Sequence, residues 1–344
     1  MKAGLTLLFA LLLVGLCACA PKGPEVLKVM THDSFAASKQ VIKEFESANQ
    51  VTVQFIPSGD AGTALNKAIL SKGNPIADVF YGVDNTFLSR ALSEDVFEPY
   101  DSPLLAKIPK SYQLDPQKRL LPVDYGDVCL NYDIAYFKEK GLEPPRNLQD
   151  LTRPEFKGLL VVENPATSSP GLAFLLATIG RFGMDGYQAY WQALVANDVL
   201  AVNDWESAYN TEFSAHGGVR PIVVSYGSSP PAEVIFADPP IQEPPIAVIT
   251  DDRSCFRQIE FVGILRGTKQ SALAQKWIDF MLSVQFQEDM PLQMFVFPIN
   301  PEATLPDPFA RYAVIPSETA QVSPDEIAAN RDLWLKEWTD LVLR

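Results

Sequence analysis

Apolar residues along the chain repeat alternately with the period of a strand and with the period of an amphipathic helix. Strands are predicted at 26–31, 51–56 and 77–81, because each run is short and rich in β-branched and aromatic residues. Between the first two strands, Val41 and Phe45 fall on one side of a helix. Such strand and helix units predict an α/β protein with a largely parallel sheet, covered by helices on both faces.

The same alternation returns in the second half of the chain. Further strands are predicted at 158–163 and 221–225. The stretch 229–245 contains three Pro-Pro pairs, which predicts a loop rather than a regular helix or a central strand. The chain ends in an amphipathic helix with a clear start, because Ser323 can act as N-cap and Glu326 can complete a capping box.

Two α/β regions in a chain of 344 residues predict two lobes. Residues 26–124 form the first part of lobe 1, and residues 125–256 form lobe 2. Residues 257–344 return to lobe 1 and add C-terminal helices that pack across the lobes. The crossings are expected at 124–133 and 257–265, where two strands would act as a hinge and the lobes would close on a ligand in the cleft.

The first residues of the chain predict export. A lysine precedes an apolar run at 5–16, which is shorter than the roughly 20 residues that span a bilayer. Residues 1–18 are therefore predicted to be a lipoprotein signal peptide. Cys19 is the expected lipidated residue, because alanine precedes it whereas leucine precedes Cys17. Residues 19–25 then form a tether, and the protein is extracytoplasmic and anchored to the membrane.

Composition and charge exclude several functions. The net charge of -14 opposes binding to nucleic acid, and hydrophobic residues make up 47% of the chain, enough for two cores. Beyond the signal peptide region, two cysteines and two histidines are not spaced as metal ligands. Cys129 and Cys255 can form a disulfide in an oxidising compartment, or they can be two small buried apolar residues.

Four motifs lie at strand-to-helix junctions, which is the edge where α/β sheets bind ligands. Two aromatic residues and a carboxylate suit an organic cation, and serines before a proline at a helix start suit a phosphate or carboxylate. Ordinary helix capping and core packing explain each motif taken alone. The candidate residues are Asp60, Ser168, Ser169, Trp205, Tyr226, Gly227, Ser228 and Ser229.

Eight short motifs also carry a family resemblance. They are THDSFA at 31–36, ADVFYGVDN at 77–85, DYG at 124–126, TSSPGL at 167–172, DWESAY at 204–209, SYGSSP at 225–230, FMLS at 280–283 and MFVFP at 294–298. Together they resemble the thiamine-binding lipoproteins and periplasmic proteins that serve thiamine ABC transporters. The resemblance covers nearly all of the mature chain.

The resemblance implies a type II periplasmic-binding-protein fold with the ligand in the interlobe cleft. It implies a monomer without cofactors that binds thiamine and its mono- and pyrophosphate and delivers them to a membrane permease. Asp60 and Ala61 would contact the pyrimidine side of thiamine, and Trp205 and Tyr226 would line the ring pocket.

The same resemblance assigns the other end of the ligand. Ser168, Ser169 and the run 227–229 would hold the hydroxyethyl group or the phosphates. The chain departs from the family at four positions: His32 stands where the family often has an aromatic residue, Ala61 where it has Gly, Ala232 where it has Tyr, and Phe295 where it has Trp. His32, Ala61 and Phe295 are also predicted to bind the ligand. Fewer aromatic residues would weaken stacking or shift the preference among thiamine and its phosphates.

Three other functions fit parts of the sequence. A ferric-ion receptor of this fold uses adjacent tyrosines, whereas Tyr226 has no tyrosine neighbour in the sequence. A polyamine receptor would use several acidic and aromatic cleft residues, which Asp33, Asp84 and Trp205 could supply. An exported hydrolase needs a nucleophile beside a base, and no GxSxG motif accompanies either histidine. The sequence therefore favours a binding protein over an enzyme.

Overall fold

The computed structural model describes residues 25–343. The predicted signal peptide and Cys19 lie outside the described residues, as does all of the predicted tether except Glu25, which begins the first strand. Within 25–343, no helix is both long and apolar enough to cross a bilayer.

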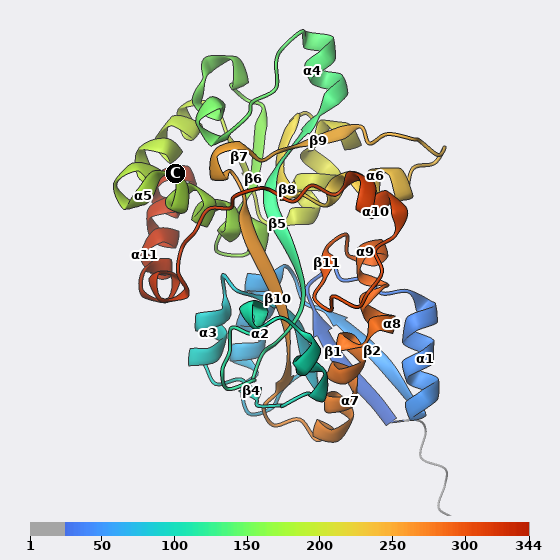
Figure 1. Ribbon diagram of the computed structural model, residues 1–344. Coiled ribbons are helices and arrows are strands. Elements are labelled where there is room, and N and C mark those ends of the chain that lie inside the picture. Colours follow the sequence, from blue (N-terminus) through green and yellow to red (C-terminus); the bar gives the residue numbers. More distant parts are fainter. Residues whose placement is uncertain (1–24, 344) are drawn as a thin grey trace, which may run out of the picture.

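The first lobe is built on three parallel strands with helices between them (Figure 1). The order in the sheet is β2-β1-β3, so the chain runs from β1 outward to the edge strand β2 and then crosses back past β1 to β3, nearer the middle of the sheet. These elements confirm the predicted alternation of strands and helices. Their bounds are β1 Glu25–Thr31, α1 Lys39–Asn49, β2 Val51–Pro57, α2 Ala61–Leu70, β3 Val79–Asp84, α3 Leu88–Ser93 and β4 Phe97–Glu98.

The second lobe repeats this plan with a long helix on one side of its strands (Figure 1). Its central strand β6 pairs in parallel with β7 and β8. The helix α5 is interrupted at Gly183, whose φ of 75° is accessible to glycine at little cost. The bounds are α4 Ile134–Lys140, β6 Leu160–Glu163, α5 Ser169–Ala196, β7 Leu200–Val202, β8 Ile222–Tyr226, α6 Ser229–Ile235 and β9 Ile246–Ile249.

Two long strands pass between the lobes at the predicted crossings. β5 (Leu121–Asp133) and β10 (Phe256–Leu265) pair antiparallel, and β10 pairs with β3 while β5 pairs with β8. The lobes therefore share one continuous sheet. The predicted parallel pairing is confirmed for β2-β1-β3 and for β6 with β7 and β8. It does not extend to β5 and β10, which pair antiparallel with their neighbours because β10 returns to the first lobe in the direction opposite to β5.

The C-terminal part of the chain first packs on the first lobe and then returns to the second. Its last helix, α11, contacts α5 in the second lobe and α3 in the first. The guanidinium of Arg331 on α11 lies 4.7 Å from the centroid of the Phe87 ring, next to α3. This third crossing adds to the two hinge strands. The bounds are α7 Ser271–Leu282, α8 Val284–Gln287, α9 Met290–Gln293, β11 Phe297–Pro298, α10 Asp307–Tyr312 and α11 Pro324–Val342.

The proline-rich stretch differs from its prediction. A helix, α6, forms over its first seven residues, with Pro230 and Pro231 in the first turn. Proline is tolerated there, because the first backbone N–H groups of a helix have no partner within it. Only the remainder of the stretch is irregular before β9. The helix matters for the site, since it carries Ser229 and Glu233 toward the cleft.

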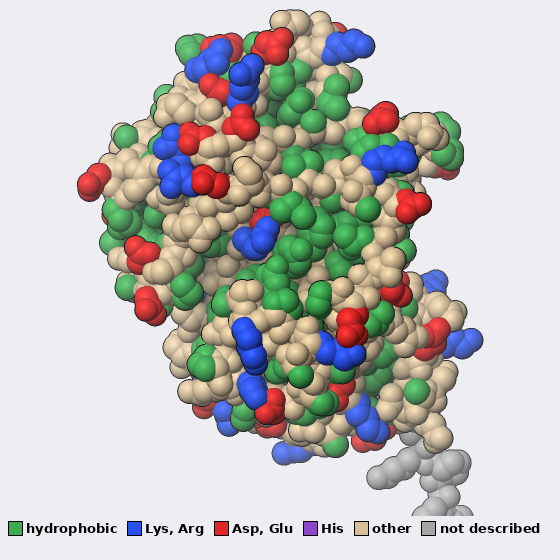
Figure 2. Space-filling view, viewed as in Figure 1, with side chains coloured by type: hydrophobic (Ala, Val, Ile, Leu, Met, Phe, Trp, Pro, Cys, Tyr) green, Lys and Arg blue, Asp and Glu red, His purple; other side chains and the backbone are tan. Residues whose placement is uncertain are grey.

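The distribution of hydrophobic and charged side chains on the surface reflects the division into two lobes. On the face shown in Figure 2, hydrophobic side chains gather in the middle, where the lobes meet, and charged side chains lie mainly on the outer parts. A disulfide joins Cys129 of β5 to Cys255 at the start of β10, with Cα atoms 4.4 Å apart. It ties the two hinge strands together at their second-lobe end.

This disulfide can be tested on a protein spanning residues 20–344, which contains no other cysteine. Without reductant, the denatured protein should show no reactive thiols. Reduction should lower the free energy of unfolding by roughly 2 to 5 kcal/mol, because it frees a long loop in the unfolded chain. The measurement is thiol titration with urea unfolding, with and without reductant. The double variant Cys129→Ser/Cys255→Ser is the control, and two free thiols in the unreduced protein would contradict the bond.

Candidate ligand-binding site

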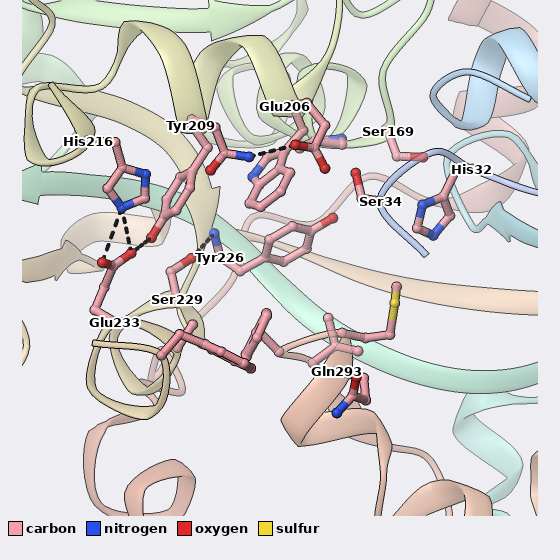
Figure 3. Close-up of a pocket in the computed structure, with 18 of the residues that line it drawn as sticks. His32, Ser34, Ser169, Glu206, Tyr209, His216, Tyr226, Ser229, Glu233 and Gln293 are labelled. Carbon is pink, nitrogen blue, oxygen red and sulfur yellow. Dashed lines mark hydrogen bonds and ion pairs between the residues drawn. The ribbon is translucent and has the colours of Figure 1, made fainter. Parts of the chain in front are cut away.

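A cavity of about 710 Å³ lies between the lobes. Its size is typical of pockets that enclose a small organic molecule. Both lobes contribute walls, from the loop after β1, the starts of α2 and α5, the segment after β7, α6, β10 and the segment after α9 (Figure 3). The cleft is thus bounded by strand-to-helix junctions on one side and by a hinge strand on the other.

Three aromatic side chains from the second lobe form one wall of the cavity. The Trp205 and Tyr209 rings stack, with centroids 4.9 Å apart and planes 16° from parallel. The Trp205 Nε1 donates a hydrogen bond of 3.0 Å to Ser225 Oγ, which fixes the indole. Tyr226 follows on the end of β8. Because Tyr209 covers one face of the indole, only the other face can stack on a ligand.

Asp60 connects the lobes at the edge of the cavity. It is the N-cap of α2 in the first lobe and accepts a hydrogen bond from its neighbour, the Ala61 backbone N–H, at 2.9 Å. The Trp205 backbone N–H in the second lobe lies 3.4 Å from its other oxygen. Burial raises the pKa of Asp60 to about 6, and the Ser168 hydroxyl and these two N–H groups limit the rise. At neutral pH Asp60 is therefore mainly a carboxylate.

Two further hydrogen bonds cross between the lobes beside Asp60. The Gly62 backbone N–H donates to the Thr167 carbonyl at 3.0 Å, and the Ser169 hydroxyl donates to the buried Asp84 carboxylate. The start of α5 is therefore held against α2 and the end of β3. The helix start predicted as an anion site faces two carboxylates, Asp60 and Asp84.

A buried group of carboxyls lies under the cavity on the hinge strands. Glu260 of β10 is opposite Asp124 of β5 in the sheet. The Tyr81 hydroxyl lies 2.7 Å from an Asp124 oxygen and 3.0 Å from a Glu260 oxygen. Burial raises the pKa of Asp124 to about 7 and that of Glu260 well above its ordinary value. The buried pair therefore loses its protons at a higher pH than exposed carboxyls do.

His32 lies beside this carboxyl pair, with its Nε2 3.5 Å from Glu260 Oε1. Burial lowers the pKa of His32 to about 4, so the imidazole is neutral at physiological pH. In the region covered by the structure, no group of three or more His, Cys, Asp or Glu side chains is arranged to hold a metal ion.

Comparison with known proteins decides the family. The family model described as bacterial extracellular solute-binding protein matches residues 74–340. The chain belongs to this family. The thiamine-binding periplasmic protein of Salmonella typhimurium is 31% identical over 334 residues, which cover 96% of this chain and 97% of the relative.

Solved structures agree on the fold of this solute-binding protein. A periplasmic thiamin binding protein superposes with a TM-score of 0.82 at 28% identity, covering 93% of this chain and 97% of the other. A ferric binding protein from Campylobacter jejuni superposes with a TM-score of 0.72 at 20% identity, covering 92% and 99%. The fold is thus the type II periplasmic-binding-protein fold, which is shared by receptors with unrelated ligands.

The structure brings eight of the eleven predicted ligand-binding residues to the cavity wall of the solute-binding protein. Ser168, Gly227 and Ser228 are buried behind the wall and do not line it. Gly227 instead joins segments through its backbone, with its N–H on the Asp127 carbonyl and its carbonyl accepting from the Val314 N–H. The residues that do line the cavity are His32, Asp60, Ala61, Ser169, Trp205, Tyr226, Ser229 and Phe295.

Several residues that line the cavity were not predicted from the sequence. Gln258 and Glu260 come from a strand far along the chain, and their spacing of two residues places them on one face of β10. Glu233 follows Ser229 by one turn of α6 and therefore lies on the same side of the helix. This relation could not be predicted, because the stretch was expected to be a loop. Tyr209 could have been predicted, because it follows Trp205 by four residues, which places both rings on one side of a helix.

The raised pKa values predict how stability depends on pH. The folded protein binds more protons than the unfolded chain between about pH 4 and pH 7, so the free energy of unfolding should fall as the pH rises through this range. Replacing Glu260 with Gln removes one of the two carboxyls. It should reduce that fall by on the order of 1 to 2 kcal/mol.

Urea unfolding of Glu260→Gln and of the unchanged protein from about pH 5 to pH 8 measures this effect. The exposed Glu318, replaced in the same way, is the matched control and should keep the full dependence. A Glu260→Gln protein with an unchanged pH dependence would show that the buried pair does not titrate as described.

Proposed function

We propose that this protein is an extracytoplasmic receptor for thiamine. The observation that carries the proposal is the cavity between the lobes, where one available indole face and the Asp60 carboxylate lie together. Thiamine pairs a flat aminopyrimidine with a cationic ring, and such a ligand gains from both stacking and negative charge. The thiamine-binding relatives and the shared motifs support the same assignment.

The aromatic wall would hold the rings of the ligand. Trp205 would stack on the ligand with the face that Tyr209 leaves uncovered, and Tyr226 would flank it. Asp60 would accept a hydrogen bond from the amino group of the pyrimidine, a bond strengthened by its charge. Since Asp60 also accepts from the Trp205 N–H, ligand binding and lobe contact would depend on the same carboxylate.

Ferric iron is a weaker candidate. Iron binding in this fold would need tyrosine hydroxyls that converge on one ion. The Tyr209 hydroxyl instead donates to Glu233 at 2.7 Å, and the Tyr226 hydroxyl lies 3.4 Å from the Gln258 side-chain oxygen. A polyamine would be attracted by the carboxylates but would leave the aromatic wall without a planar partner.

Delivery to the membrane follows from the proposed lipidation. A receptor anchored by diacylated Cys19 would stay at the membrane surface, which raises its local concentration near an ABC permease. The strand β1 belongs to the first lobe and begins at Glu25, the last residue of the predicted tether, so the anchor would be attached to one lobe and leave the other free to move. The protein would act as a carrier and leave the ligand chemically unchanged.

Thiamine binding is best measured by calorimetry, with spermidine and ferric ion as competing candidates. We expect sub-micromolar affinity for thiamine. Asp60→Asn should weaken it by roughly 10- to 100-fold, because a hydrogen bond to a charged group is lost while Asn still caps the helix. Asp185→Asn, an exposed site away from the cavity, should bind as the unchanged protein does. Tight binding of iron or spermidine in place of thiamine would refute the proposal.

The anchor can be tested separately from the site. Cys19→Ala should release the protein from membranes, because no acyl chain can be attached, while thiamine affinity in the soluble fraction stays unchanged. Fractionation of cells followed by calorimetry measures both. Retention of the Cys19→Ala protein in the membrane fraction would contradict the predicted lipid attachment.

A further inference from the structure

Gly62 lies in the first turn of α2, where backbone from the two lobes comes into contact. Its N–H donates to the Thr167 carbonyl of the second lobe at 3.0 Å, and the residue is buried without lining the cavity. The Gly62 backbone is helical and its φ is not positive, so the local conformation does not require glycine. Alanine would stabilise the helix more than glycine does. A reason for glycine at this position comes instead from the space around it.

A side chain at position 62 would collide with the second lobe. A Cβ atom there would lie 2.8 Å from the Ala166 carbonyl oxygen and 2.9 Å from the Thr167 carbonyl oxygen, closer than the 3.4 Å at which ordinary contact begins. Both oxygens belong to the backbone between β6 and α5, so they cannot rotate away as the end of a side chain can. The third neighbour, the Phe87 ring of the first lobe at 2.9 Å, is such a side-chain end. A methyl group at position 62 thus requires the lobes to move apart.

Two other contacts between the lobes lie beside Gly62. The Ser169 hydroxyl of the second lobe donates to the buried Asp84 carboxylate of the first. The helix α11 packs along α5 (Figure 1) and places the buried Arg331 guanidinium 4.7 Å from the centroid of the Phe87 ring. We call these contacts the closure seam, which consists of Gly62 with Thr167, Asp84 with Ser169, and Phe87 with Arg331. Of these six residues, only Ser169 lines the cavity.

We propose that Gly62 is a positioning residue for ligand binding, because its lack of a side chain lets the lobes close on thiamine. This inference rests on the proposed thiamine function. A ligand between the lobes contacts both walls only when the lobes are closed, so its apparent affinity falls in proportion to the population of the closed state. The affinity of the cavity therefore depends on a contact that the ligand does not touch.

Calorimetry and small-angle X-ray scattering of Gly62→Ala test this inference. The added methyl group should weaken thiamine binding by roughly 10- to 100-fold, because closure forces it against two backbone carbonyls. With saturating thiamine, the variant should keep a larger radius of gyration than the unchanged protein does. Circular dichroism should show the same secondary structure in both proteins.

Gly186→Ala is the matched control, since it places the same methyl group on α5 near only Phe182 of its own helix. It should bind thiamine and compact as the unchanged protein does. Arg331→Met tests the seam through its other end, because it keeps a long buried side chain but removes the cation beside Phe87. It should weaken thiamine binding by roughly two- to tenfold. This variant decides the matter if Gly62→Ala does not fold.

The outcomes separate closure from ligand contact. Unchanged thiamine affinity in Gly62→Ala would overturn the inference and leave the proposed function standing. Weaker binding with full compaction would also overturn it, because Gly62 would then act on the cavity wall and not on closure. If the unchanged protein does not bind thiamine, the proposed function fails and this inference fails with it.

Discussion

The pairing of β5 with β10 is the constraint on which the rest of the molecule depends. These antiparallel strands join the sheets of both lobes into one, and the disulfide fixes their second-lobe end. Midway along them, Asp124 and Glu260 face each other under the cavity and share the Tyr81 hydroxyl. The register of β5 against β10 therefore determines how the two lobes are connected, and it also places Asp124 beside Glu260 under the cavity.

The electrostatics of the site follow from this arrangement. Carboxyl groups enclosed between two lobes lose hydration, which raises their pKa values. For Asp60, hydrogen bonds from neighbouring N–H groups limit this rise. A cationic ligand in the cleft would supply a counter-charge to the Asp60 carboxylate. Asp60 also bonds to the Trp205 N–H in the other lobe, so the same group that would attract a cation helps to hold the cleft closed.

Local signals in the sequence predicted local structure well. The predicted capping box of Ser323 and Glu326 is present, because it depends on residues within one turn. The strand directions were predicted less well, since the repeated strand and helix units do not reveal that β10 returns antiparallel. The proline pairs led to a wrong prediction of a loop. Proline destabilises the interior of a helix but is tolerated in its first turn, which is where Pro230 and Pro231 lie in α6.

In the site too, features that depend on neighbouring residues were predicted, and features that depend on distant strands were not. Residues at strand-to-helix junctions, such as Trp205 and Tyr226, reach the cavity as expected. Gly227 and Ser228 belong to a motif that ends at the wall, but which members of it face inward depends on the turn between β8 and α6. Glu260 could not be placed from sequence, since its partners come from strands more than a hundred residues away.

A structure of the protein crystallised with thiamine tests the central claim most directly. The account predicts thiamine between the lobes, with its amino group within hydrogen-bonding distance of Asp60 and a ring stacked on the open face of Trp205. Thiamine bound outside the cleft, or in the cleft without contact to either residue, would contradict it.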